Sequence, residues 1–151
     1  MRILTPLIRQ RGLAIVETAI TLPFLLFVML AATEISNAFI QHTSLTKAVR
    51  DGARWAAEEA IDSTGFNWTK DLERETLNLV VYGNRAGLGA PLVPGLSTGD
   101  VTVEPVGGDN IEVSVNYPYS GIFGSVLPSF GYGSNISTLF NMNATVTMRA
   151  L

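Results

Sequence analysis

The chain has 151 residues, of which 47% are hydrophobic and 15% charged, so it has room for one domain of ordinary size. It contains no cysteine and a single histidine, which excludes disulfides, cysteine nucleophiles and metal sites built from thiolates or several histidines. No catalytic constellation is recognisable in the remaining residues. We therefore predict a protein that is not an enzyme and that needs neither a cofactor nor a metal.

Charge is distributed unevenly along the chain. The first twelve residues carry three arginines and no acid, whereas the remainder holds seven basic and thirteen acidic residues, a balance of 7 − 13 = −6. No basic patch is left to neutralise phosphates, which argues against a nucleic-acid partner. The asymmetry instead fits a single-pass protein whose N-terminus stays in the cytoplasm while its body is exported.

An apolar segment follows the basic leader of residues 1–12. Over residues 13–33 the only ionisable side chain is Glu17, and about twenty residues suffice to cross a hydrocarbon core of roughly 30 Å as a helix. We therefore predict a transmembrane helix over residues 13–33. A removed signal peptide is the competing interpretation, but such peptides usually have a shorter apolar core and a small-x-small cleavage site, which the end of this segment fits poorly.

Glu17 is the informative residue of this segment. An acid in a membrane helix is costly, roughly 2.5–3.5 kcal/mol for a comparable Asp at the helix centre, and the plain interpretation is a carboxylate that reaches the lipid headgroups. A sharper interpretation supplies a partner charge, because cleavage after Gly12 would create an amino group on Leu13, one helical turn from Glu17. The Glu17 of a neighbouring subunit could neutralise that amino group.

Arg11-Gly12, followed by an apolar run with an acid as the fifth residue after the glycine, resembles the prepilin-peptidase site of type IV pilins. The resemblance implies that an aspartyl protease in the membrane cuts between Gly12 and Leu13, and that Glu17 serves assembly. Thr18 departs from the pattern, because Tad-type (Flp) pilins and pseudopilins usually carry an aromatic residue at this position.

The helix is predicted to continue beyond the membrane over residues 34–65. Apolar and small residues recur there at three- and four-residue steps, which is typical of one face of a helix. They are Ile35, Ala38, Phe39, His42, Leu45, Val49, Gly52, Ala53, Ala56 and Ala60. One helix from Leu13 to about Asp62 would be roughly 75 Å long at 1.5 Å per residue, which is a pilin-like stalk.

Within this stalk a stripe of small residues recurs at every fourth position: Ala48, Gly52, Ala56 and Ala60. Small residues let two helices approach closely, so the stripe predicts helix packing, either between subunits or against the chain's own sheet. Charged side chains lie on or beside the stripe, among them Arg50, Asp51 and Arg54. Their plain interpretation is a solvated helix face.

The exported body, residues 66–151, is predicted to be α+β. A helix over Thr69 to Val81 begins with its first residue as the N-cap. Alternating residues then predict a hairpin of Val101–Val106 with Ile111–Tyr117, and a third antiparallel strand from Phe140 to Ala150. A sheet of about three strands has one apolar face, which the amphipathic stalk can cover.

Between the second and third strands lies the apolar segment GIFGSVLPSFGYG, residues 121–133. Five of its side chains share a face if it forms a helical turn: Ile122, Phe123, Val126, Leu127 and Phe130. We favour the interpretation that this segment closes the end of the core. Contact with the membrane or with another subunit is the alternative.

The string AVRDGARWAA, residues 48–57, resembles the hallmark that follows the membrane helix in TadE-like proteins. VVYGN (residues 80–84) and APLVPGL (residues 90–96) resemble the next segment of that family. The resemblance implies a TadE-like minor pseudopilin of the Tad (Flp) pilus assembly and secretion machinery, with Arg50, Asp51 and Arg54 as charges of the family motif.

The same resemblance implies where the protein lies and what it contacts. We expect the bacterial inner membrane, with the C-terminal domain in the periplasm and a place either at the pilus base or in the filament. The expected partners are the lipid bilayer, a prepilin peptidase, other pilins and pseudopilins, and the Tad inner-membrane assembly proteins. The alternative function is an uncleaved, single-pass, membrane-anchored periplasmic binding domain.

Overall fold

The computed structural model describes residues 8–63, 65–131 and 133–150, and it has the predicted α+β class. The described residues form two compact units. The first unit combines the chain up to Asn37 with Ser120–Thr138, and the second combines Ala38–Tyr119 with the chain from Leu139 onward. Segments far apart in the sequence therefore meet within each unit.

One long helix, α1, covers Ile8–Glu59, so it begins before the predicted membrane segment and ends slightly before the predicted stop. It contains Pro23, whose missing N–H removes one backbone hydrogen bond without ending the helix. Directly after α1, a short hairpin of β1 (Ile61–Asp62) and β2 (Gly65–Phe66) reverses the chain. The glycine in this hairpin has a φ of 117°, a conformation that side chains with a Cβ rarely adopt.

The second predicted helix is confirmed as α2, Lys70–Tyr82. The hydroxyl of Thr69 accepts a hydrogen bond from the Leu72 N–H at 3.2 Å, which satisfies one of the unpaired donors of the first turn. At the other end, Gly83 has a φ of 72° and its N–H donates to the carbonyl of Leu79 at 2.9 Å. This left-handed cap explains why the helix stops there.

The three predicted strands form one antiparallel sheet in the order β3-β4-β7. Their bounds are Val101–Pro105 for β3, Asn110–Tyr119 for β4 and Phe140–Arg149 for β7. A short 3-10 helix, η1 (Thr98–Asp100), leads into β3. Val113 of β4 stands opposite Val103 and Val146, and alternate residues of β4 are buried, so one face of the sheet is covered.

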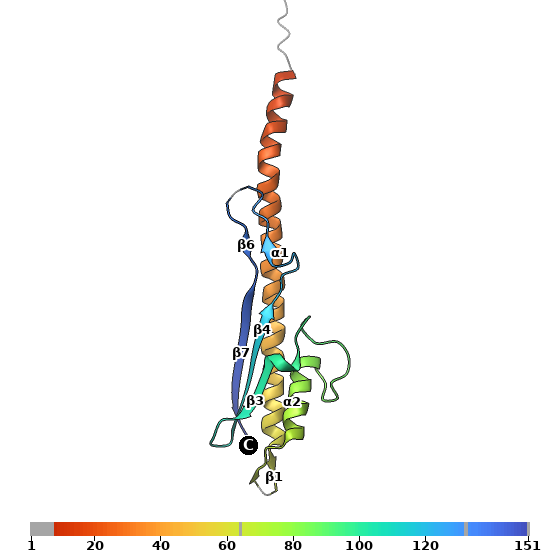
Figure 1. The fold of residues 1–151 in the computed structure, drawn as a ribbon, viewed down its shortest axis with the longest axis vertical. Helices are drawn as coiled ribbons and strands as arrows, with labels where there is room; N and C mark the ends of the chain where they lie inside the picture. The colour runs from red at the N-terminus through yellow and green to blue at the C-terminus, as the bar shows by residue number, and fades with distance from the viewer. Residues whose placement is uncertain (1–7, 64, 132, 151) are drawn as a thin grey trace, which may run out of the picture. The chain divides into compact units, whose positions relative to one another are not determined.

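In the second unit, α2 and the C-terminal part of α1 supply the cover for this sheet (Figure 1). Leu45 and Val49 from α1, Val80 from α2, and Ile111 and Val113 from β4 are all fully buried in one core. The unit is therefore held together by helix-on-sheet packing, as predicted.

The predicted buried face of α1 is correct only in part. The residues from Leu45 onward are buried, whereas Ile35, Phe39 and His42 are exposed. At 3.6 residues per turn, Phe39 lies about 120° around the helix from Leu45. The regular three- and four-residue steps therefore do not keep all these residues on one face, and the earlier ones lie outside the face that the rest of the chain covers.

In the first unit, the segment Ser120–Thr138 lies beside α1 (Figure 1). It is not a helical turn, because β5 (Val126–Leu127) pairs with β6 (Ile136–Ser137) in a small antiparallel hairpin. Of the five apolar side chains predicted to share a face, only that of Leu127 is buried. The favoured interpretation, that this segment closes the core of the sheet, is wrong.

Candidate functional site

The N-terminal part of α1 carries the predicted cleavage and assembly residues. Gly12, Leu13 and Glu17 are all exposed on it, and a Cβ added at Gly12 would meet no atom within 4 Å. Leu13 and Glu17 are separated by one helical turn, as predicted. Residues 1–7 of the predicted leader lie outside the described residues. The structure thus leaves the Gly12–Leu13 bond uncovered, although within a helix.

α1 is long and apolar enough to cross a membrane, and none of its most apolar stretch is buried within the chain. The three hydroxyl side chains within residues 13–33 each donate to the backbone carbonyl four residues earlier. Thr18 donates to the carbonyl of Ala14 at 2.9 Å, and Thr21 donates to that of Glu17 at 2.7 Å. Thr18 therefore carries no unpaired hydroxyl hydrogen into this apolar surface, where such a group would be costly.

Glu34 is the most unusual residue of α1, because it is an acid with only 5% of its surface exposed. Its carboxylate accepts a hydrogen bond from the N–H of Ile122 at 3.1 Å, and the N–H of Phe123 lies at 3.5 Å. Two successive backbone N–H groups that converge on one carboxylate form an anion-binding nest. The contact joins α1 to a segment more than eighty residues later in the chain.

Gly121 makes this approach possible. A Cβ at position 121 would lie 2.4 Å from Oε1 of Glu34 and 2.8 Å from the carbonyl oxygen of Gly124. The N–H of Gly124 also donates to the carbonyl of Gly121 at 3.2 Å, which closes a tight turn. Any side chain at position 121 would therefore push the carboxylate out of its nest.

The predicted small-residue stripe, Ala48, Gly52, Ala56 and Ala60, is buried within the second unit. A Cβ added at Gly52 would lie 2.4 Å from Cγ2 of Val80, so this glycine lets α2 approach α1 closely. The stripe thus packs inside the chain. At Gly52 the neighbouring element is α2, whereas the sequence had suggested the sheet.

The charges that the resemblance assigned to a family motif lie on the outer face of the same helix. Arg50, Asp51 and Arg54 are exposed, and Arg54 forms an ion pair at 3.5 Å with Glu58, four residues later on the helix. Both side chains of that pair are mostly solvent-exposed, and exposed pairs contribute little to stability. The interpretation as a solvated helix face fits these positions.

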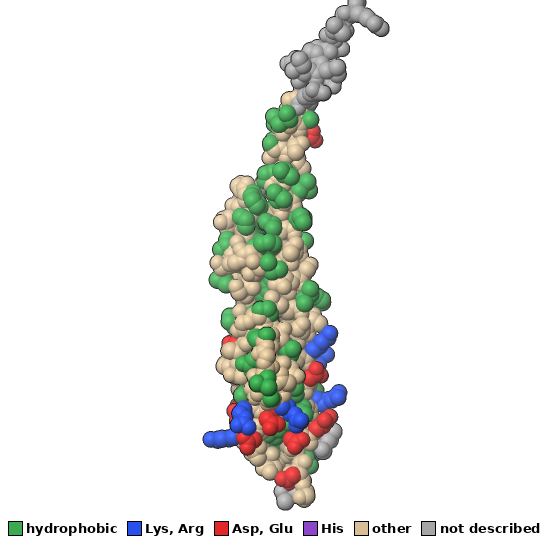
Figure 2. Space-filling model, turned by 90° about the vertical axis from the view of Figure 1, so that its right-hand side faces the viewer, with side chains coloured by type: hydrophobic (Ala, Val, Ile, Leu, Met, Phe, Trp, Pro, Cys, Tyr) green, Lys and Arg blue, Asp and Glu red, His purple; other side chains and the backbone are tan. Residues whose placement is uncertain are grey.

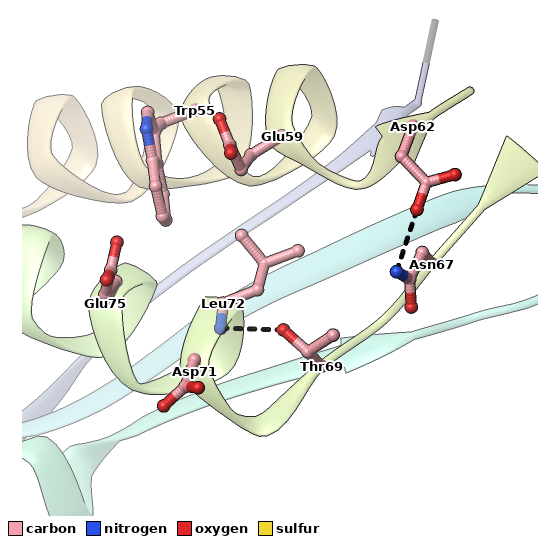
Figure 3. A pocket seen from close by; sticks show the side chains of 8 residues that line it. All are labelled: Trp55, Glu59, Asp62, Asn67, Thr69, Asp71, Leu72 and Glu75. Atoms are coloured by element: carbon pink, nitrogen blue, oxygen red, sulfur yellow. Dashed lines mark hydrogen bonds between the residues drawn. The ribbon is translucent and has the colours of Figure 1, made fainter. Parts of the chain in front are cut away.

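A pocket in the second unit lies between the end of α1 and the start of α2 (Figure 3). Two of the carboxylates that line it serve the local fold. Asp62 accepts a hydrogen bond from the side-chain amide of Asn67 at 2.9 Å, and Asp71 pairs with Arg74 at 2.9 Å. No group of three metal-ligating side chains occurs among the residues that the structure describes.

Sequence reasoning missed the contact between Glu34 and Gly121. The signal was present, because Glu34 is the first acid after the apolar segment, and the glycines of Gly-Ile-Phe-Gly flank the two N–H donors. What the sequence did not provide was their pairing, since the two segments are far apart along the chain.

Comparison with known proteins supports the family resemblance. Residues 12–54 match the family model described as TadE-like protein. This range covers the apolar part of α1, Glu34 and most of the 48–57 motif. No curated protein and no solved structure gives a significant match to the chain.

Proposed function

Because its N-terminal helix is TadE-like over residues 12–54, we propose that this chain is a structural minor pseudopilin of the Tad (Flp) pilus machinery. In this proposal a prepilin peptidase cuts after Gly12, and the mature subunit is held in the bacterial inner membrane by α1. Its C-terminal domain, residues 66–151, faces the periplasm, and its partners are other pilins and Tad inner-membrane assembly proteins.

The observation that carries the proposal is an exposed apolar helix with an acid near its start. The surface of α1 from Leu13 to Met29 is rich in exposed large hydrophobic side chains, and Glu17 is exposed among them. Small residues next to Glu17, namely Ala14, Thr18 and Ala19, help to line a shallow depression on the helix. Such a surface suits packing against other membrane helices.

Glu17 gives this packing a direction. Cleavage after Gly12 would leave a positively charged amino group on Leu13, and in an apolar surrounding that group needs an opposite charge. Among the side chains described, ion pairs join Arg54 to Glu58 and Arg74 to Asp71, and Glu17 takes part in neither. In the proposed assembly, Glu17 of one subunit neutralises Leu13 of the next, which makes a head-to-tail contact that need not close.

The experiment is the substitution Glu17→Gln, which keeps the size of the side chain and removes its charge. The expected result is a processed protein of normal size that no longer supports pilus formation, measured by immunoblotting of membranes and by electron microscopy of cells. Glu59→Gln is the matched control, because Glu59 is an exposed carboxylate on the same helix. Normal piliation with Glu17→Gln would overturn the proposed role of the carboxylate.

The cleavage step has its own test in Gly12→Arg. An arginine at this position should block the peptidase, so the chain should keep its leader and migrate more slowly on gels. A product of unchanged size would count against this site.

The alternative is an uncleaved anchored domain that binds a ligand. It would need a binding site, and the pocket shown in Figure 3 is the candidate in the second unit. Two of the carboxylates there, Asp62 and Asp71, already pair within the chain. The N-terminal residue of the mature protein separates the two functions, because only the pseudopilin requires a chain that starts at Leu13.

A further inference from the structure

The segment Gly121–Thr138, hereafter the interfacial loop, buries two polar side chains while it exposes most of its large apolar ones. Ser129 and Thr138 are buried in it, with 7% and 5% of their surfaces exposed. Leu127 is buried as well, but five other large apolar side chains of the loop are exposed, with between 42% and 56% of their surfaces accessible. These outward residues are Ile122, Phe123, Val126, Phe130 and Ile136.

The buried polar groups of the interfacial loop are paired within it. The hydroxyl of Ser129 donates to the carbonyl of Gly133 at 2.6 Å, and that of Thr138 donates to the carbonyl of Gly124 at 2.6 Å. The N–H of Ser129 donates to the side-chain oxygen of Asn135 at 3.0 Å. A segment that satisfies its buried polar groups and exposes large apolar side chains is suited to the polar–apolar boundary of a membrane.

Charge and backbone conformation point the same way. No Asp, Glu, Lys or Arg occurs between Glu112 and Arg149. The loop could therefore enter a membrane without transferring a charged side chain out of water. Phe130 has a φ of 51°, a conformation that bulky residues rarely adopt, and yet its ring is exposed. Figure 2 shows hydrophobic side chains on the first unit, whereas charged side chains gather on the second.

Glu34 fixes the loop at one level of α1. It comes directly after the apolar segment of residues 13–33, which is about long enough to span a hydrocarbon core. Through its bonds to the N–H groups of Ile122 and Phe123, it holds the loop directly beyond this apolar segment. Within the first unit, the apolar surface of the loop continues the apolar surface of the helix.

We propose that the interfacial loop is a second membrane contact, which inserts its outward apolar side chains at the boundary between lipid headgroups and acyl chains. This inference rests on α1 as the membrane anchor of the proposed function, but not on cleavage or pilus assembly. Apolar side chains that enter this boundary while polar groups stay paired are the usual basis of interfacial membrane binding. Glu34 acts as the tether that positions the loop.

The absence of cysteine from the chain allows a direct test. Ile136→Cys places a spin label on the loop, Leu22→Cys places one on the apolar part of α1, and Glu104→Cys places one on the exposed surface of β3. The full-length protein is reconstituted in vesicles of phosphatidylethanolamine and phosphatidylglycerol. Accessibility to oxygen, which concentrates in acyl chains, is compared with accessibility to a water-soluble nickel chelate.

The label at position 136 should favour oxygen, as the label at position 22 does, whereas the label at position 104 should favour the nickel chelate. If position 136 behaves like position 104 while position 22 lies in lipid, the loop proposal is overturned and the anchor stands. If the spectrum at position 136 is broadened and sharpens on dilution with unlabelled chain, the loop contacts a second copy and the lipid proposal is overturned. Nickel access at position 22 would overturn the anchor and the loop together.

The tether is tested in the same reconstituted protein. Glu34→Ala should raise nickel access at position 136 severalfold, because the loop loses the carboxylate that holds its turn. Glu59→Ala removes an exposed carboxylate from the same helix and should leave that access unchanged. Equal nickel access with and without Glu34 would overturn the tethering role.

Discussion

Replacing Gly52 with alanine should destabilise the second unit, although alanine is the better helix former. The gain in helix propensity is about 1 kcal/mol. Against it, the new Cβ would lie 2.4 Å from Cγ2 of Val80, and overpacking of this kind costs about 1–3 kcal/mol. Val80 is fully buried and β-branched, so it has one strongly preferred rotamer and cannot swing aside. We therefore expect a net loss of about 1 kcal/mol in the free energy of unfolding.

The assay is urea unfolding of the full-length protein in detergent micelles, followed by tryptophan fluorescence. Trp55 and Trp68 are the only two tryptophans, and both pack against the core of the second unit. The free energy in the absence of urea follows by linear extrapolation. Gly12→Ala is the control, because a Cβ at Gly12 meets no atom within 4 Å, and it should leave the unfolding of this unit unchanged.

A double-mutant cycle identifies Val80 as the cause. Val80→Ala alone should cost roughly 2 kcal/mol through lost burial, but it also removes the methyl groups that crowd position 52. Gly52→Ala with Val80→Ala should then be about 1 kcal/mol more stable than Val80→Ala alone, because only the gain in helix propensity remains. The coupling free energy would be about 2 kcal/mol. Additive effects would refute this account of the stripe. A Gly52→Ala variant that unfolds normally but fails to assemble would instead support the interpretation that the stripe packs between subunits.

Three further predictions concern other contacts. Gly121→Ala should expel the carboxylate of Glu34 from its nest and so speed hydrogen exchange of the backbone N–H groups of Ile122 and Phe123. Unchanged exchange rates at these two groups would contradict the nest. Thr69→Ala should lower the free energy of unfolding in urea by about 1 kcal/mol through loss of the N-cap. An unchanged free energy would show that the hydroxyl plays no part in capping. Burial, and secondarily the charge of Asp100, raises the pKa of Tyr117 above its ordinary 10.0. Because the folded pKa exceeds the unfolded one, stability should fall as the pH rises from 10 through the raised pKa, and Tyr117→Phe should abolish that fall in urea midpoints.

Local patterns predicted the elements of the second unit well. The hydroxyl of Thr69 and the left-handed Gly83 mark the two ends of α2, and alternation of apolar residues placed all three strands. These signals act within a few residues, so they can be read without knowing the rest of the fold. The packing of Gly52 against Val80 needed the relative placement of two helices, which periodicity does not give.

The first unit was harder to predict because its contacts are distant in sequence. The apolar segment after β4 is hydrophobic enough to suggest a core plug, and only the structure places it with α1 and leaves Phe130 exposed. Glu34 went unnoticed for the same reason, since its partners Ile122 and Phe123 offer backbone N–H groups that any residue could supply. The position of Glu17, one helical turn from Leu13, was predictable because it depends only on spacing within one helix; its role in assembly stays a prediction.

The N-terminal residue of the mature protein tests the central claim most directly. The protein should be extracted from membranes of its own host and analysed by N-terminal sequencing and intact mass. A pseudopilin cut after Gly12 predicts a chain that begins at Leu13 and has lost the mass of residues 1–12. A chain that retains its leader would contradict the claim and favour the uncleaved anchored domain.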